Sequence, residues 1–290
     1  MIARSVSLLL LIAVVLSCSS ATDDRPRASA TSGNVEVELL SEGASVQPGR
    51  PFHVGLRMRM HDGWHTYWKN PGDAGLPLRI AWDLPEGFTA GPIEWPAPER
   101  ISGENLVSYG YHGEVLLPVE ITPPATISGK RITLGGTFEW LECAEICVPA
   151  SATLSRSLPV QQGLPAPGSH TASFAEARAR IPAAPDGWTF AATAGAGAIL
   201  LEFHVPPGAA SLHGAYLFVD RPLVVDYVAA QRFERKGAGY RLTVNSAPNA
   251  QEAPDRMTGV LVVEADSGPG ARSAVRVDVA VRPGGSASVP

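Results

Sequence analysis

The sequence has 290 residues, a formal net charge of −5 at pH 7 and charges scattered along its length. Nucleic-acid binding calls for a basic patch, so this charge pattern argues against that class of function. The 26 prolines and 29 glycines favour short strands joined by turns over helices. The sequence also lacks the Gly-x-Ser-x-Gly, His-Glu-x-x-His and glycine-rich phosphate-loop motifs of common enzyme classes.

The N-terminal residues 1–21 have the pattern of an export signal. Arg4 supplies a positive charge, and residues 8–16 form an apolar run that is too short to cross a bilayer. Residues 15–18 match a lipobox, which predicts that Cys18 is lipidated and becomes the mature N-terminus. Cleavage by the ordinary signal peptidase at the Ser-Ser-Ala that follows is the alternative. We therefore expect a periplasmic protein, with a lipid anchor in the outer membrane if Cys18 is modified.

Strand patterns fill the first half of the exported chain. Residues 22–33 are polar, and we expect them to form a flexible tether. After them, apolar and polar residues alternate with a period of two, which indicates strands with one buried face. Their spacing, with no good helix among them, predicts an antiparallel β-sandwich over residues 34–160. The expected strands are residues 35–39, 54–60, 78–82, 115–121, 132–140 and 152–160.

The second half predicts a linker and another β-rich unit. Residues 161–184 are rich in proline and glycine and include one short helix, residues 174–181, with Ser173 as its cap. Residues 185–290 read as a second, smaller β-sandwich-like domain. No motif in it carries chemistry, so we expect a spacer or a docking surface. Its expected strands are residues 199–205, 215–219, 240–244, 259–265 and 274–281.

Cys143 and Cys147 are the cysteines that remain once Cys18 is set aside. In a straight strand their Cα atoms would lie about 13 Å apart, whereas a disulfide needs about 7 Å or less. A bond therefore requires the chain to fold back between them, and an oxidising compartment favours such a bond. Closing so small a loop stabilises the fold by only ~2 kcal/mol. This favours a redox-active pair, with a structural bridge and metal ligation as the alternatives.

Three segments resemble one known family, in the right order. The segment Trp-Leu-Glu-Cys-Ala-Glu-Ile-Cys-Val-Pro, residues 140–149, resembles the active-site hairpin of the N-terminal periplasmic domain of the DsbD family of thiol:disulfide interchange proteins. The aromatic segment at residues 62–73 has a form typical of the longer, copper-stress-associated branch. Residues 113–119 resemble the strand that follows the family's cap loop. The resemblance covers about residues 34–160.

The resemblance implies an immunoglobulin-like sandwich and a cysteine pair that works as a redox relay. The attacking cysteine of the family corresponds to Cys147, and Cys143 is then the resolving thiol. The family's cap loop, which shields the sulfurs until a partner arrives, corresponds to residues 101–109. The candidate shielding residues are Trp64, Tyr67 and Trp140 among the aromatic residues, and Asn105, Leu106 and Tyr109 in the cap loop.

The resemblance also implies partners. The family's pair is reduced by a transmembrane protein and passes electrons to thioredoxin-fold periplasmic proteins, without a cofactor. The family's membrane and thioredoxin-like domains do not follow residue 160 here, so we expect a separate membrane thiol reductase as the donor to a protein-disulfide-reductase-type relay domain. His65 is a candidate for lowering a thiol pKa if it lies near the pair; otherwise it is an exposed turn histidine.

Two alternatives to a relay remain at this point. Met58, Met60, His61 and His65 lie in one stretch, and soft sulfur ligands select Cu(I), which suggests copper handling. The two methionines also alternate as core-facing strand residues, which argues against a ligand role. The other alternative is a scaffold with a structural bridge that docks to envelope proteins.

Overall fold

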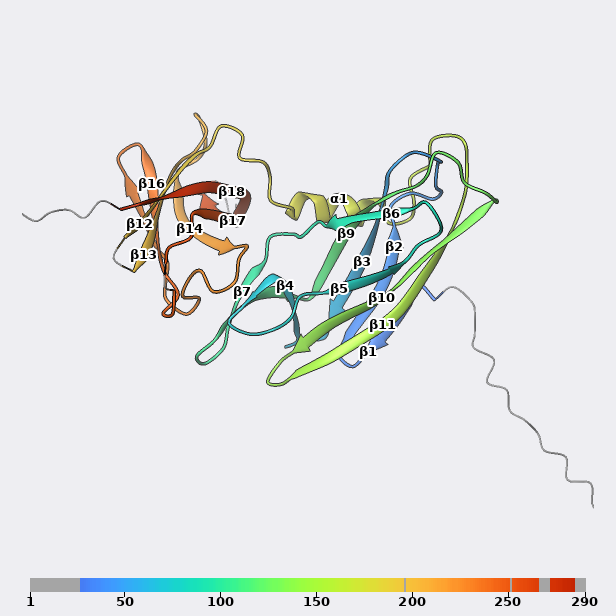
Figure 1. Cartoon of the computed structure of the whole chain (residues 1–290), viewed down its shortest axis with the longest axis horizontal. Helices are drawn as coiled ribbons and strands as arrows, with labels where there is room; N and C mark the ends of the chain where they lie inside the picture. Colours follow the sequence, from blue (N-terminus) through green and yellow to red (C-terminus); the bar gives the residue numbers. More distant parts are fainter. Residues whose placement is uncertain (1–26, 196, 251, 266–271, 285–290) are drawn as a thin grey trace, which may run out of the picture.

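The computed structural model describes residues 27–284, except 196, 251 and 266–271 (Figure 1). The predicted export signal, the predicted lipidation site Cys18, the first part of the predicted tether and residues 285–290 lie outside the described residues. Within the described residues, no helix is long and apolar enough to cross a membrane.

Two antiparallel sheets packed on a shared core form the first domain, which confirms the predicted immunoglobulin-like β-sandwich. One sheet has the strand order β1-β2-β3-β9-β6. The other has the order β11-β10-β4-β8-β7, with β5 paired to β10. The strands are β1 (Ser29–Ser32), β2 (Val35–Ser41), β3 (Phe52–Met60), β4 (His65–Gly72), β5 (Arg79–Asp83), β6 (Thr89–Ile93), β7 (Glu99–Ser102), β8 (Val107–His112), β9 (Glu114–Thr122), β10 (Arg131–Cys143) and β11 (Cys147–Pro159).

Alternating residues build the core between the two sheets. On β2, Val35 and Val37 are fully buried, whereas Glu36 between them is exposed. On β3, Met58 is buried in the same core. Successive side chains of a strand point to opposite faces, so an apolar residue at every second position is enough to fill one side of each sheet.

The N-terminal tether is shorter than expected. Ser29–Ser32 pairs in antiparallel register with β2, so the chain is already part of the sheet within the predicted tether of residues 22–33. Gly33 makes this possible, because it takes a left-handed conformation with φ +58° at the tight turn. The side chain of Glu142 accepts a hydrogen bond from the backbone N–H of Asn34 at 3.1 Å and ties the turn to β10.

The helix α1 (Thr171–Arg180) begins three residues before the predicted start at residue 174. Its N-cap position is His170, which makes no capping hydrogen bond from its side chain, so Ser173 lies inside the helix and is not its cap. The hydroxyl of Thr171 donates instead to backbone carbonyls of the preceding loop and of β2's end, at Gly168 (3.0 Å) and Glu42 (3.1 Å).

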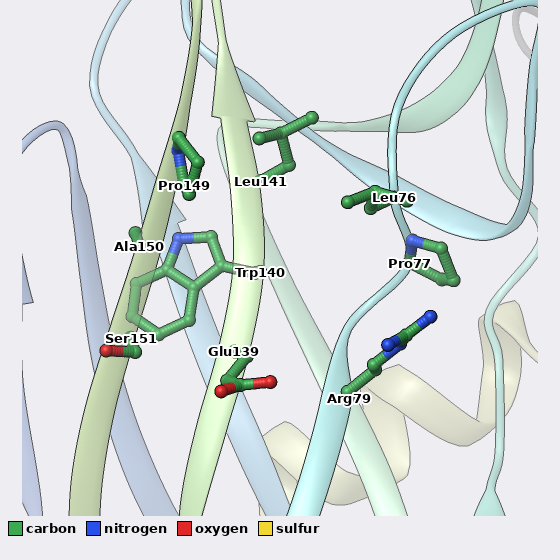
Figure 2. Close-up of a pocket in the computed structure, with 9 residues that line it drawn as sticks. All are labelled: Leu76, Pro77, Arg79, Glu139, Trp140, Leu141, Pro149, Ala150 and Ser151. Atoms are coloured by element: carbon green, nitrogen blue, oxygen red, sulfur yellow. The ribbon is translucent and has the colours of Figure 1, made fainter.

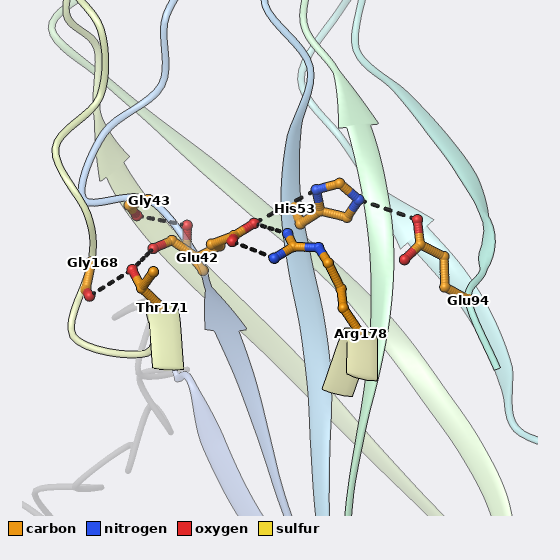
Figure 3. A network of polar contacts seen from close by, with 8 residues as sticks. Glu42, Gly43, His53, Glu94, Gly168, Thr171 and Arg178 are labelled. Carbon is orange, nitrogen blue, oxygen red and sulfur yellow. Dashed lines mark hydrogen bonds and ion pairs between the residues drawn. The ribbon is translucent and has the colours of Figure 1, made fainter. Parts of the chain in front are cut away.

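The helix covers the outer face of the first sheet. Phe174 and Ala177 pack on Leu40 and Leu116, which form a small second core. Figure 3 shows the polar contacts at its edge: Arg178 makes a two-pronged ion pair with Glu42. In the same network, His53 lies between the carboxylates of Glu42 and Glu94, 3.7 and 3.2 Å away. The helix therefore anchors the linker to the first domain.

Seven strands form the second domain. Their order is β14-β17-β18-β12-β13-β16-β15, and all neighbours are antiparallel except β12 and β18, which pair in parallel through residues 192–194 and 281–283. Most predicted strands of this half coincide with observed ones, but β12 and β15 were not expected. The strands are β12 (Thr189–Gly195), β13 (Ala198–His204), β14 (Leu212–Val219), β15 (Arg232–Lys236), β16 (Gly239–Asn245), β17 (Arg256–Ala265) and β18 (Arg272–Pro283).

An aromatic cluster joins the two domains. Trp68 on β4 and Tyr109 on β8 pack edge-on against Phe218 on β14, with ring centroids 6.4 and 4.8 Å apart. Apart from the small core under α1, most buried apolar residues of both domains belong to one continuous cluster. The second domain is therefore packed directly against the sheet that carries the cysteines.

Candidate redox site at the β10–β11 turn

The cysteine pair closes a long two-stranded hairpin. β10 and β11 pair along their whole length, from Arg131 opposite Pro159 to Cys143 opposite Cys147. A tight turn of three residues joins them, with the N–H of Ala144 donating to the carbonyl of Ile146 at 3.1 Å. The turn supplies the fold-back that the spacing requires, and the predicted Cys143–Cys147 disulfide is present, with Cα atoms 4.1 Å apart. The hairpin end projects from the lower edge of the first domain (Figure 1).

The two sulfurs differ in access. Cys143 is 1% exposed, whereas Cys147 belongs to the exposed run of residues that forms the turn and the start of β11. Thiol–disulfide exchange requires an incoming thiolate to reach a sulfur atom. Cys147 is therefore the residue of the pair that solvent reaches, and Cys143 is the buried one.

Tyr67 on β4 is the residue whose side chain contacts both sulfurs. Its hydroxyl donates a hydrogen bond to Cys143 Sγ at 2.7 Å and lies 3.4 Å from Cys147 Sγ. Burial raises the pKa of the Tyr67 hydroxyl, with an opposing contribution from Ser108. The group therefore keeps its proton at neutral pH and acts as a donor toward sulfur.

His65 lies beside the pair but carries no charge there. It is the register partner of Cys143 on one side and of His112 on the other. Burial, and then the nearby His112, lower the pKa of His65 to about 4. The imidazole is consequently neutral at pH 7 and has no positive charge with which to lower a thiol pKa. The residue is close to the pair, and its role as a modulator of a thiol pKa in the reduced protein stays a prediction.

The other two aromatic candidates belong to the core. Trp140 shares its face of β10 with Glu142, to whose carboxylate its Nε1 donates at 3.4 Å. Alternation places Cys143 on the opposite face, so Trp140 does not shield the sulfurs directly. Trp64 is half-buried and packs against the main core cluster.

The predicted cap residues lie in different environments and do not form one lid. Tyr109 is fully buried under the second domain, with its hydroxyl 3.1 Å from that of Tyr216, so it is not a lid. Its large ring is more stable inside the domain interface than over an exposed sulfur. Asn105 and Leu106 are exposed at the tip of the β7–β8 hairpin, where the N–H of Gly103 donates to the carbonyl of Leu106.

A different segment, residues 73–77, lies on Tyr67. Gly75 takes φ +117°, and a Cβ added there would overlap the Tyr67 ring. The backbone of Gly75 is therefore in direct contact with the aromatic ring that contacts the sulfurs. Asp73 fixes the start of this segment, since its carboxylate accepts from the N–H of Val107 at 2.8 Å. In the sequence, the available signal for this contact is a glycine in a loop. A loop glycine alone does not reveal which aromatic ring its backbone will contact.

The proposed copper ligands are not brought to the sulfurs. Met58 and Met60 are buried in the core on β3, which belongs to the opposite sheet. Cys143 lies on the β10 face that points away from that core, together with Leu141. Of the four candidate copper ligands, His65 alone lies beside the pair in the strand register. The methionines are thus core residues, as their alternation indicated.

Comparisons with known proteins agree with this geometry. Residues 36–159 match the family model described as "Thiol:disulfide interchange protein DsbD, N-terminal". A solved structure, the N-terminal periplasmic domain of ScsB from Proteus mirabilis, matches with a TM-score of 0.63 and 18% identity, over 87% of this chain and 97% of that chain. This similarity shows a shared fold over both domains.

The remaining comparisons add little. The MSCRAMM ACE of Enterococcus faecalis aligns with 9% identity over 89% of this chain and 97% of that chain, but its TM-score of 0.16 is too low to indicate a common fold. Comparison with curated protein sequences gives no match. The sandwich, the cysteine hairpin and the family match lead to one conclusion: residues 36–159 of this chain match the DsbD N-terminal domain family.

Proposed function

We propose that this protein is a periplasmic thiol–disulfide exchange module, in which the Cys143–Cys147 pair passes electrons from a separate membrane thiol reductase to thioredoxin-fold proteins. One observation carries the proposal: an exposed sulfur, Cys147, is bonded to a buried sulfur, Cys143, that receives a hydrogen bond from Tyr67. A purely structural bridge has no need of this asymmetry. The export signal supports the periplasmic location, and lipidation at Cys18 would anchor the module to the membrane.

The chemistry balances as two exchange steps. A thiolate of the donor attacks Cys147 Sγ, the bond between Cys147 and Cys143 breaks, and its electron pair leaves on Cys143 Sγ. The Tyr67 O–H lies where that negative charge develops, and hydrogen bonds to charged groups are the strong ones. The donor's second thiolate then attacks the donor sulfur of the mixed disulfide and releases Cys147. Two electrons enter the pair, and the same steps in reverse reduce the next protein.

An apolar groove beside the disulfide supports a protein partner. By strand register, Leu141 and Pro149 lie on the same face as the two cysteines, two residue pairs further along the hairpin. Leu76, which is 55% exposed, borders them from the loop before β5, and Ile146 in the turn is 67% exposed. Figure 2 shows the groove between β5, β10 and β11. It is lined by Leu76, Pro77, Arg79, Glu139, Trp140, Leu141, Pro149, Ala150 and Ser151.

The groove and the turn present apolar side chains near Cys147, with the charged Arg79, Glu139 and Glu145 among them. Exposed apolar patches of this kind mark protein-interaction sites. We infer that a thioredoxin-fold partner places the apolar residues around its own cysteine on this surface, with its sulfur directed at Cys147.

Trapping tests the proposal. Cys143→Ala leaves Cys147 without its resolving thiol, so the variant should accumulate a mixed disulfide with a thioredoxin-fold protein in periplasmic extract. Cys147→Ala is the matched control and should trap little, because the remaining Cys143 is buried. The adducts are resolved by non-reducing electrophoresis and identified by mass spectrometry. Absence of a thioredoxin-fold adduct with Cys143→Ala would overturn the proposed function.

A further inference from the structure

The strand β4 connects the disulfide to the second domain. Its residues His65 and Tyr67 lie beside the cysteines, and the next three residues contact the second domain. Trp68 is fully buried against Phe218, and Lys69 makes an ion pair with Asp220 at 2.7 Å. The residue that reaches the sulfurs and the residues that reach the second domain are thus neighbours on one strand.

β4 also leaves its regular pairing at this point. Up to Tyr67, which is opposite Gly110, β4 and β8 pair in register; pairing resumes only at Gly72 opposite Ser108. The five-residue advance on β4 is matched by two residues on β8, so residues 68–71 form an irregular segment. Such a segment lacks ladder hydrogen bonds to hold it, and its conformation depends on other contacts.

Asn70 supplies those contacts. Its side chain is 1% exposed and donates to the carbonyl of Val219 at 2.8 Å, across the domain interface. Its Nδ2 also lies 3.2 Å from the hydroxyl of Tyr227, which in turn accepts from the N–H of Leu223. Toward its own domain, the Asn70 Oδ1 accepts from the N–H of Gly72 at 3.1 Å. One buried amide therefore links the second domain to the end of the irregular segment.

From Gly72 the contacts return to the sulfur. Residues 73–77 follow directly, and the backbone of Gly75 packs on the ring of Tyr67. The N–H of Asp73 donates to the carbonyl of Val107 at 3.0 Å, and the hydroxyl of Ser108 donates to the carbonyl of Ala74 at 3.2 Å. Tyr67 is consequently held between its own strand and a loop whose start is fixed through Asn70.

We propose that the second domain sets the reactivity of the disulfide, with Asn70 and Tyr227 as positioning residues that hold the Tyr67 hydroxyl against Cys143. This inference rests on the proposed function, in which Cys143 leaves as a thiolate. It gives the second domain a task beyond that of a spacer. Neither positioning residue touches a sulfur. Both act through residues 68–77, which follow Tyr67 in the sequence and return to its ring at Gly75.

The test measures the rate at which dithiothreitol reduces the disulfide in the full chain at pH 7. Tyr227→Phe removes one interface hydroxyl and should slow reduction about fivefold, the effect expected from loosening one hydrogen-bonded contact. Tyr240→Phe is the matched control: its hydroxyl also accepts a backbone N–H, from Leu212 at 3.0 Å, but inside the second domain. The control should change the rate less than twofold.

Coupling is then tested in a Tyr67→Phe background. If Tyr227 acts through the Tyr67 hydroxyl, Tyr227→Phe has no further effect once that hydroxyl is gone. An unchanged rate in the Tyr227→Phe single variant, or an equal slowing in both backgrounds, would overturn the inference. Circular dichroism and the melting temperature verify that each variant is folded. A small thiol needs no partner, so failure here leaves the trapping experiment, and with it the proposed function, standing separately.

Discussion

The hydroxyl of Tyr67 lies 2.7 Å from the Sγ of Cys143, although 76 residues separate the two along the chain. The oxygen keeps its proton because burial raises its pKa. It is therefore placed to stabilise a thiolate on the buried sulfur more closely than one on Cys147, whose Sγ lies 3.4 Å away. Under the proposed function, this shorter contact favours departure of Cys143 as the thiolate.

Removing that hydroxyl should slow the reaction. We expect Tyr67→Phe to reduce the rate of disulfide reduction by dithiothreitol at least about tenfold, because a hydrogen bond to a charged group is worth about 1.5–3 kcal/mol. Tyr111→Phe is the control, since it also removes a buried hydroxyl, one that donates to the carbonyl of Pro96 at 2.8 Å. Stopped-flow or quenched-flow kinetics give both rates. Equal rates in the two variants would contradict the assigned role.

The difference in access should appear as selective alkylation. In the fully reduced protein, iodoacetamide should modify Cys147 at least about tenfold faster than Cys143, since access and thiolate fraction control thiol reactivity. Peptide mass spectrometry of samples quenched at successive times gives both rates. The same protein in denaturant is the control, where the two rates should converge. Faster modification of Cys143 in the folded state would show that the buried sulfur is the accessible one.

Gly75 should be sensitive to a single added methyl group. Gly75→Ala meets the Tyr67 ring and requires φ +117°, so we expect a loss of about 2–4 kcal/mol in the free energy of unfolding together with slower exchange. Gly113→Ala is the comparison, because Gly113 has φ +65° but open space around it. That variant should lose about 1 kcal/mol and exchange at the normal rate. Urea unfolding and dithiothreitol kinetics measure both effects; normal exchange in Gly75→Ala would contradict the proposed contact.

The pKa of His65 predicts a pH dependence of stability. The folded state holds this pKa at about 4, below the ordinary value of 6.5, through burial and His112. The unfolded chain therefore binds more protons between these values, and stability that is fully present above pH 6.5 is lost as the pH falls toward 4. Allowing for solvent screening of a half-buried ring, the loss is on the order of 1–2 kcal/mol.

Urea unfolding of the wild type and of His65→Gln, at pH values from 4.5 to 7.5, measures this contribution. The variant should show a shallower decline toward acid pH, by the same 1–2 kcal/mol in order of magnitude. Parallel curves for the two proteins would mean that His65 titrates normally in the folded state.

A substitution in the groove should slow exchange with a protein partner and leave reduction by a small thiol unchanged. Leu76→Asp places a charge beside Leu141 and should weaken transfer to the thioredoxin-fold partner at least about fivefold, while reduction by dithiothreitol stays unchanged. Leu164→Asp is matched, since Leu164 is also exposed, at 71%, but lies in the linker. Transfer is followed by the rate of mixed-disulfide formation in the Cys143→Ala background. Equal transfer in both variants would remove the groove from the interface.

Much of the architecture could be predicted from the sequence because it depends on local patterns. The alternation around Val35 and Met58 marks which face of a strand is buried, and it needs no knowledge of the opposite sheet. The spacing of Cys143 and Cys147 already implies a fold-back, since a bond between them is geometrically possible only in a turn. The β-sandwich and the disulfide both follow from such short-range information.

Tertiary structure alone decided which groups surround the sulfurs. β4 and β8 are largely buried on both faces, so their sequences do not alternate between apolar and polar residues. These residues could therefore be interpreted from the sequence only through the family resemblance. Tyr109 was expected over the cysteines but lies under the second domain, because an interface between domains offers a large ring more burial than a loop does. The contacts of Tyr67 with Cys143 and of Asn70 with Val219 join residues 76 and 149 positions apart. Side-chain geometry over such separations depends on how whole sheets pack, which no local pattern encodes.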